Sequence, residues 1–203
     1  MALKSFVYVS EVDNLSDARF AAGMGVDLVG FKLDPTDAQS LDKAKFDEIS
    51  EWIAGVKIVG EFGATPPDQV KELLEAYKLD YLLIENEELI NEYSLFGVPL
   101  ILKMQLDDPD HMSTLLQMGK GIVDYFLIEA QDDTLEANAE GLIRDWSSNF
   151  PILLGFGITA QNASSLKESL GIEGIALKGS PELRPGYKEF DELADILEEL
   201  EVD

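Results

Sequence analysis

Four charged residues recur at the same place in a repeated sequence pattern. In each copy an acidic residue is followed by a short apolar run, and a charged residue comes five positions after the acid. These charged residues are Lys32, Glu85, Glu129 and Lys178. Ammonium groups hold small anions and carboxyl groups exchange protons, so four such side chains at one place could bind and convert a small polar molecule.

Several other catalytic groups are absent from the sequence. The chain has no cysteine and a single histidine, His111. Disulfides, thiolate nucleophiles and Cys-rich or His-rich metal sites are therefore excluded. We expect no metal and no cofactor, and carboxylates and lysines become the main candidates for chemistry.

The strongly acidic composition restricts the partners of the chain. Forty acidic residues oppose 15 basic ones, for a net charge of −25, which repels nucleic acid and anionic membrane surfaces. No apolar run reaches the length of a membrane span, and no signal peptide is apparent. We therefore expect a cytoplasmic protein, monomeric or homodimeric, with neither nucleic acid nor membrane as a partner.

The elements that position the charged residues can be read from the same pattern. The four copies read GVDLVGFK, KLDYLLIE, IVDYFLIE and GIEGIALK, and the apolar runs between them read FVYVS, VKIVGEF, VPLILKM and FPILLGF. Continuous apolar runs are typical of parallel strands that helices cover on both faces. A repeat of roughly fifty residues then contains two strand–helix units.

Helix signals separate these eight runs. Thr65-Pro66-Pro67 opens a segment with helical spacing of apolar residues, and Thr159 opens another that ends at Gly171. Eight strands alternating with helices in 203 residues predict a small (β/α)8 TIM barrel in which residues 1–203 form a single domain. An open doubly wound sheet is the alternative. It is less favoured, because such a sheet would not account for the fourfold repeat or for the eighth strand.

The barrel brings the charged residues to one face. Functional residues of this fold lie at the C-terminal ends of the strands, where Lys32, Lys103 and Lys178 would form an island of positive potential for a small anion. In the alternative interpretation, Lys–Glu pairs close the mouth and no ligand binds. Side chains alternate along a strand, so Glu11 should point away from the mouth if its neighbour Ser10 points inward.

Alignment of the odd-numbered strands by their apolar runs makes a further prediction. It places Ser10 in register with Gly60, and Glu11 in register with Glu61. Lys103 and Gly155 share the position of Ser10, and Met104 and Phe156 share that of Glu11.

Two glycine-containing turns follow the seventh and eighth runs. They read GFGITAQN and KGSPELRPG, and the corresponding loops of this fold are the usual phosphate site, where free N–H groups at helix starts hold the anion. The predicted phosphate-binding residues are Gly157, Lys178, Gly179 and Ser180. The expected partner is a phosphorylated small molecule.

Nearly end to end, the chain resembles the phosphoribosylanthranilate isomerase family. AAGMGVDLVGF matches the family's A-G-A-D-A-x-G-F, and DYLLIENEE falls on its D-x-x-Q-L-H-G-D-E. Lys103 matches the lysine of I-K-A, and Glu129 falls on the carboxylate of L-L-D. GFGITAQN matches the turn A-G-G-L-x-P-E-N, and KGSPELRPGYKE corresponds to S-S-G-V-E-x-x-P-G-x-K-D.

The sequence departs from the family pattern at its chemical positions. The family's strand-1 cysteine falls on Ser10, its strand-4 histidine is replaced by Glu85, and Phe156 replaces a glycine of the turn. The loop after the second strand lacks the family's arginine, which leaves Lys32 as the local cation.

The resemblance implies an aldose–ketose (Amadori) isomerase of tryptophan biosynthesis. This reaction needs a general acid that opens the ribose ring and a general base that takes a proton next to the imine carbon. By resemblance Glu129 is the acid and Lys103 an electrostatic stabiliser. Ser10 occupies the base position although a hydroxyl stays protonated near neutrality, and Glu85 is its substitute.

The remaining predictions concern substrate contacts and alternative functions. Lys32, Phe156 and Arg184 are the predicted substrate-binding residues. One alternative is a catalytically inactive homologue that acts as a binding or interaction protein. Another is a Schiff-base enzyme using Lys103 or Lys178, which requires a lysine of lowered pKa.

Overall fold

Eight parallel strands close into a barrel in the computed structural model, which describes residues 2–179, 182–184, 187–188 and 191–202. The barrel strands are β1 (Phe6–Ser10), β2 (Leu28–Lys32), β3 (Lys57–Glu61), β4 (Tyr81–Ile84), β5 (Leu100–Gln105), β6 (Tyr125–Glu129), β7 (Ile152–Leu154) and β8 (Gly174–Lys178). Each strand pairs with the next, and β8 returns to β1. This confirms the predicted (β/α)8 TIM barrel and excludes the open sheet.

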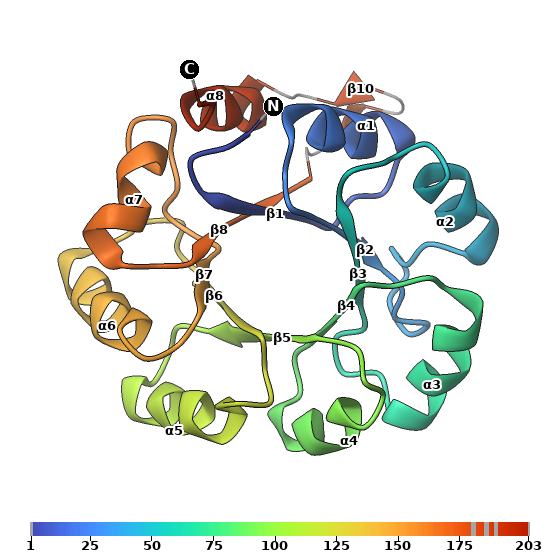
Figure 1. The fold of residues 1–203 in the computed structure, drawn as a ribbon, viewed down its shortest axis with the longest axis horizontal. Coiled ribbons are helices and arrows are strands. Elements are labelled where there is room, and N and C mark those ends of the chain that lie inside the picture. Colours follow the sequence, from blue (N-terminus) through green and yellow to red (C-terminus); the bar gives the residue numbers. More distant parts are fainter. Residues whose placement is uncertain (1, 180–181, 185–186, 189–190, 203) are drawn as a thin grey trace.

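Helices form the outer layer around the ring of strands (Figure 1). They are α1 (Leu15–Met24), α2 (Lys43–Ser50), α3 (Pro67–Ala76), α4 (Ile90–Ser94) after a 3-10 turn η1 (Glu87–Leu89), α5 (Pro109–Gly119), α6 (Ala137–Ser147), α7 (Ala163–Leu170) and α8 (Asp191–Glu199). A two-stranded hairpin, β9 (Glu182–Arg184) and β10 (Tyr187–Lys188), lies between β8 and α8. None of the helices in the described part of the chain has the length and apolar character needed to cross a membrane.

The repeated acids of the sequence have a structural role at the bottom of the barrel. Three of them accept a hydrogen bond from a backbone N–H at or near the start of the preceding strand. The bonds join Val7 N–H to Asp27, Ile58 N–H to Asp80 and Leu100 N–H to Asp124, with lengths of 2.9, 2.8 and 2.9 Å. Each acid thus ties an even-numbered strand to the odd-numbered strand before it, which explains why the acid recurs.

Two apolar cores lie on either side of the sheet. The larger one fills the space between strands and helices. The smaller one fills the barrel interior with side chains that alternate along the strands; it consists of Tyr8, Leu28, Val59, Tyr81, Leu83, Ile101, Leu127, Leu153 and Ala176. Apolar packing therefore closes the interior below the mouth, and the cavity above it is lined largely by polar side chains.

Local capping explains where several helices begin and end. Asn14 accepts a hydrogen bond from Asp17 N–H at the start of α1, and Gly25 ends that helix with a left-handed φ of 81°. Gly171 ends α7 in the same way, at the predicted residue. The start of α7 is Ala163 rather than Thr159, because residues 159–162 form a turn before the helix.

Candidate active site

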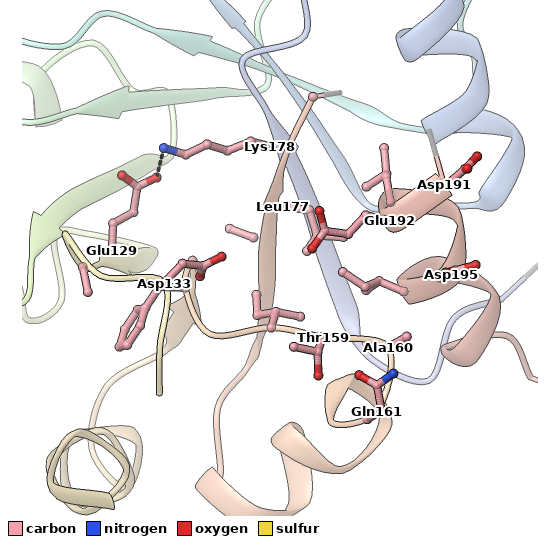
Figure 2. Close-up of a pocket in the computed structure, with 18 of the residues that line it drawn as sticks. Glu129, Asp133, Thr159, Ala160, Gln161, Leu177, Lys178, Asp191, Glu192 and Asp195 are labelled. Carbon is pink, nitrogen blue, oxygen red and sulfur yellow. Dashed lines mark ion pairs between the residues drawn. The ribbon is translucent and has the colours of Figure 1, made fainter. Parts of the chain in front are cut away.

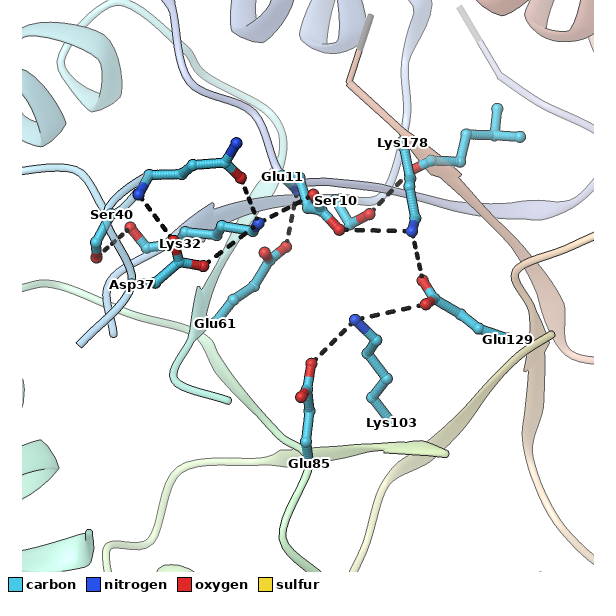
Figure 3. A network of polar contacts seen from close by, with 12 residues as sticks. Ser10, Glu11, Lys32, Asp37, Ser40, Glu61, Glu85, Lys103, Glu129 and Lys178 are labelled. Atoms are coloured by element: carbon cyan, nitrogen blue, oxygen red, sulfur yellow. Dashed lines mark hydrogen bonds and ion pairs between the residues drawn. The ribbon is translucent and has the colours of Figure 1, made fainter. Parts of the chain in front are cut away.

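Charged side chains form a chain of alternating ion pairs across the barrel mouth (Figure 3). We call it the mouth chain; it runs through Asp37, Lys32, Glu11, Lys178, Glu129, Lys103 and Glu85. Successive N–O distances from the Asp37 end are 3.5, 3.2, 3.6, 3.5, 3.5 and 3.0 Å. The structure therefore gathers the four repeated charged residues, together with Lys103, at one place.

Glu11 joins this chain, contrary to the prediction that it points away. Its carboxylate lies 3.2 Å from Lys32 Nζ and 3.6 Å from Lys178 Nζ. The strict alternation of side chains ends with β1 at Ser10, and Glu11 has a left-handed φ of 56°. A left-handed conformation is uncommon for a residue other than glycine, so the surrounding contacts must hold it.

The ion pairs set the protonation of the lysines at the mouth. Burial lowers the pKa of Lys103, but the carboxylates of Glu129 and Glu85 outweigh burial and raise it above its ordinary value. Lys32 behaves in the same way because of Glu11 and Asp37. A raised pKa keeps an amine protonated and poorly nucleophilic, which disfavours Lys103 as a Schiff-base nucleophile.

Glu129 lies at the centre of the mouth chain, between two ammonium groups. Lys103 Nζ and Lys178 Nζ each lie 3.5 Å from one of its oxygens, and its side chain is only 10% exposed. Gln105 Nε2 donates a hydrogen bond of 3.3 Å to the same carboxylate. A buried carboxylate with this many donors has one fixed orientation, toward the cavity of the mouth.

Ser10 is buried beside the mouth chain without an activating base. Its hydroxyl donates to the backbone oxygen of Leu177 on the adjacent strand β8, over 3.3 Å. No described residue accepts that proton more strongly, so the geometry offers Ser10 no route to an alkoxide.

Glu61 is a carboxylate of the mouth that the sequence analysis did not predict. It is 6% exposed, and its Oε1 accepts hydrogen bonds from Tyr8 Oη (2.5 Å) and from Glu11 N–H (3.0 Å). Burial raises its pKa to about 7, although both hydrogen bonds oppose the rise. The expected register of β3 was wrong by one residue: a Cβ on Gly60 would meet Leu79 and Phe62 of the outer core, and Glu61 faces inward.

A cavity of about 520 Å³ opens at the mouth. Its lining includes Ser10, Glu11, Lys32, Glu61, Glu85, Lys103 and Glu129. A smaller cavity of about 290 Å³ lies beyond Glu85 and reaches His111 on α5. The main cavity is large enough for a sugar-sized ligand.

A second large cavity, about 830 Å³, lies over the predicted phosphate loops (Figure 2). The two backbone donors expected there already have partners within the protein. Gly157 N–H donates to Asp133 Oδ1 (2.5 Å), and Gly179 N–H donates to the backbone oxygen of Ser10 (2.8 Å). A phosphate that uses Gly157 N–H must therefore displace the Asp133 carboxylate.

The charges around this second cavity are mostly negative. Lys178 is its one basic lining residue among the described part of the chain, and its acids are Glu129, Asp133, Asp191, Glu192 and Asp195. Phe156 is 3% exposed and packs in the outer core beside the cavity. Ser180 and the side chain of Arg184 lie outside the described residues.

Within the described residues no cluster of three or more acidic or histidine side chains could hold a metal ion. A closed eight-stranded barrel with polar side chains gathered at the C-terminal strand ends is the architecture of a (β/α)8 barrel. This defines the class of the protein.

Comparisons with known proteins identify its relatives. No family model matches the chain. The phosphoribosylanthranilate isomerase of Rubrobacter xylanophilus is 28% identical over 192 residues, which cover 90% of this chain and 92% of the relative. That of Zygosaccharomyces bailii is 26% identical over 194 residues, which cover 92% and 93%.

Solved structures of the same enzyme share the fold. Phosphoribosylanthranilate isomerase from Thermotoga maritima superimposes with a TM-score of 0.80 at 20% identity, over 97% of this chain and 98% of that one. A complex of the enzyme with reduced 1-(o-carboxyphenylamino)-1-deoxyribulose 5-phosphate superimposes with a TM-score of 0.78 at 20% identity and the same coverage. Over nearly its whole length the chain is therefore similar in sequence, and similar in fold, to phosphoribosylanthranilate isomerases.

Proposed function

We propose that the chain catalyses an aldose–ketose isomerisation of a phosphorylated sugar amine, the reaction of phosphoribosylanthranilate in tryptophan biosynthesis. The observation that carries this proposal is the pairing of Glu129 with Lys103 at 3.5 Å inside a cavity of about 520 Å³. A carboxyl group there can protonate a ring oxygen, and an adjacent ammonium group can stabilise the negative charge that develops on substrate oxygens.

The proposed ligand enters from the loops after β7 and β8. Its phosphate would lie near Lys178 and Gly157, and its sugar would reach the mouth chain between Lys103 and Glu129. Lys178 touches both regions, since it pairs with Glu129 at 3.5 Å and also lines the larger cavity. The Asp133 carboxylate must leave Gly157 N–H before the phosphate binds.

A direct assay tests the proposal. Purified protein is incubated with phosphoribosylanthranilate, and the loss of the fluorescent substrate is followed. We expect turnover that falls at least about 100-fold in Glu129→Gln and is unchanged in Glu168→Gln, which alters an exposed acid on α7. Absence of turnover in the unmodified protein, or equal rates in both variants, would contradict the proposal.

One observation favours a second candidate, a non-catalytic relative that closes its own site. Asp133 occupies the Gly157 N–H, and Lys32, Lys103 and Lys178 are all engaged in ion pairs. Such a protein would keep the fold while its own carboxylates take the place of the anionic ligand.

The response to ribose 5-phosphate separates the two candidates. A ligand that binds the native state raises the melting temperature. The isomerase proposal expects a rise in the unmodified protein and a larger rise in Asp133→Ala, because the variant frees Gly157 N–H and removes a negative charge. The non-catalytic candidate expects no rise in the unmodified protein. Asp132→Ala, which alters the exposed neighbouring acid, is the matched control.

A further inference from the structure

Glu61 is a buried carboxylate that faces the mouth and has no ion pair there. Glu11, Glu85 and Glu129 each pair with a lysine of the mouth chain. The ion pairs among the described residues do not include Glu61, although it lines the same cavity. A carboxyl group buried without a cationic partner is costly to ionise, so its retention at this place needs a reason.

Three neighbouring positions are fitted to this carboxylate. Tyr8 Oη and Glu11 N–H both donate to Glu61 Oε1, over 2.5 and 3.0 Å. Gly30 leaves the room for this contact, because a Cβ there would lie 2.0 Å from Glu61 Oε1 and 2.3 Å from Tyr8 Oη. The group is therefore held in one orientation by a phenol, a backbone amide and a glycine.

The two hydrogen bonds leave one oxygen for a ligand. Both reach Oε1, and Oε2 is the atom through which Glu61 can meet a molecule in the cavity. The pKa of this carboxyl is about 7, near which a group exchanges protons most effectively at neutral pH. Figure 3 shows Glu61 reaching toward Glu11 from the strand next to β2.

The position of Glu61 relative to Glu129 fits a pair with divided roles. Glu61 ends β3 and Glu129 ends β6, with β4 and β5 between them on the ring. Two carboxyl groups that reach one cavity from different sides can act on different atoms of one ligand. Glu61 also lies on the side of β1, where Ser10 is a poor base.

We propose that Glu61 is the general base of this site and takes the proton from C2 of the substrate. The proposal rests on the isomerase function proposed above. Tyr8 and the Glu11 amide are positioning groups. Both bind Oε1 and so hold the Glu61 carboxylate in place, while Oε2 remains for the substrate.

The step balances without any further reactant. Glu129 gives its proton to the ring oxygen as the C1–O bond breaks and the nitrogen lone pair forms the C1=N iminium. Glu61 Oε2 takes the proton of C2, the C–H electron pair becomes the C1=C2 double bond, and the iminium electrons return to nitrogen. The enol then gives its hydroxyl proton to the Glu129 carboxylate as Glu61 returns its proton to C1, so both carboxyl groups regain their starting states and the ketose has the composition of the starting aldose derivative.

Glu61→Gln tests the assignment, because glutamine can still accept from Tyr8 and Glu11 but cannot take a proton. We expect kcat to fall at least about 100-fold, with far-ultraviolet circular dichroism and melting temperature showing a folded protein. In the unmodified enzyme kcat/KM should rise with pH through an apparent pKa near 7. Any residual activity of the variant should lack this acidic limb of the pH profile. Glu168→Gln is the matched control, with rate and pH profile unchanged.

Tyr8→Phe gives a readout that does not depend on the stability of the first variant. Loss of a hydrogen bond to the charged form disfavours ionisation, so the acidic limb should move to higher pH while the rate on the plateau is retained. The assignment is overturned if Glu61→Gln keeps activity within about threefold, or if the limb is the same in Tyr8→Phe. An unmodified protein that turns over no substrate overturns the isomerase function and this assignment together, whereas an active Glu61→Gln overturns the assignment alone.

Discussion

At the scale of single residues, burial and pairing distinguish the carboxylates of the mouth. For Glu11, burial opposes ionisation, but Lys178 and Lys32 outweigh it and lower its pKa. For Glu61, burial is the dominant effect and raises the pKa to about 7. Two glutamates joined by one hydrogen bond thus favour different protonation states in the same neutral solution.

The pKa of Glu61 should make the stability of the protein depend on pH. The folded pKa is about 7 and the ordinary value is 4.5, so the folded state binds the proton more tightly than the unfolded state does. As pH rises from about 4.5 to 7, the unfolded state loses this proton first, and the free energy of unfolding falls. Glu61→Gln lacks this penalty. Its free energy of unfolding minus that of the unmodified protein should therefore increase by about 3 kcal/mol between pH 4.5 and 8.

Urea denaturation across this pH range measures that difference. The control Glu168→Gln changes an exposed group, so its difference from the unmodified protein should stay flat. A constant difference for Glu61→Gln would show that the carboxyl group ionises in the fold as it does in water.

Gly30 should be intolerant of a side chain. An added Cβ would overlap Glu61 Oε1 and Tyr8 Oη, at 2.0 and 2.3 Å, so Gly30→Ala should lower the free energy of unfolding by about 1–3 kcal/mol. Gly141→Ala on α6 is the control, because nothing lies within 4 Å of its Cβ and alanine favours a helix. Chemical denaturation of both variants compares them, and equal stability of the two would refute the packing explanation.

At the scale of elements, three of the repeated acids bind β2, β4 and β6 to the strand before each of them. Asp124→Ala removes the acceptor of Leu100 N–H, a bond of 2.9 Å at the start of β5. Loss of such a bond should cost roughly 1 kcal/mol of unfolding free energy. Thermal and urea unfolding measure the loss, and Glu168→Ala, an exposed acid on α7, should cost less. A neutral Asp124→Ala would mean that water replaces the carboxylate without cost.

The sequence predicted these elements well because their signals are local or repeated. Apolar runs, acids at fixed spacing and helix-ending Gly171 all follow from short-range rules. The number of strands then determined the closed barrel. Placing Lys32, Glu85, Glu129 and Lys178 at one face required nothing beyond their common position in the repeat.

The errors fall where structure depends on register or on distant loops. Glu61 was aligned with Glu11 rather than with Ser10 because its strand was aligned by apolar content, and a slip of one residue reverses the direction of every side chain. Glu11 was misplaced because alternation does not apply to a left-handed residue beyond the strand end. The contact of Asp133 with Gly157 spans 24 residues between two loops, and no local signal predicts it.

At the scale of the whole molecule, negative charge is the dominant electrostatic feature. A net charge of −25 opposes the compact state through self-repulsion, which salt screens over a Debye length of about 10 Å at 0.1 M. The melting temperature should therefore rise as NaCl increases from roughly 0.02 to 0.5 M, by about 2–4 °C for each kcal/mol of repulsion removed.

Scanning calorimetry in NaCl, with sucrose as an uncharged control solute, checks this expectation. Sucrose raises stability by exclusion from the surface, without screening charges, so a rise in melting temperature produced by NaCl but not by sucrose at the same concentration identifies electrostatics. A melting temperature that falls with NaCl would mean that the ion pairs of the mouth outweigh the repulsion over the rest of the surface.

The bonds made by the repeated acids also divide the molecule into modules. Asp27, Asp80 and Asp124 each bond within a pair of consecutive strands, β1–β2, β3–β4 and β5–β6. A cut at exposed Gly97, between α4 and β5, would sever none of them. Two half-barrels produced as separate polypeptides would each keep their own ties, and only the β4–β5 and β8–β1 seams would have to be rebuilt when the halves recombine.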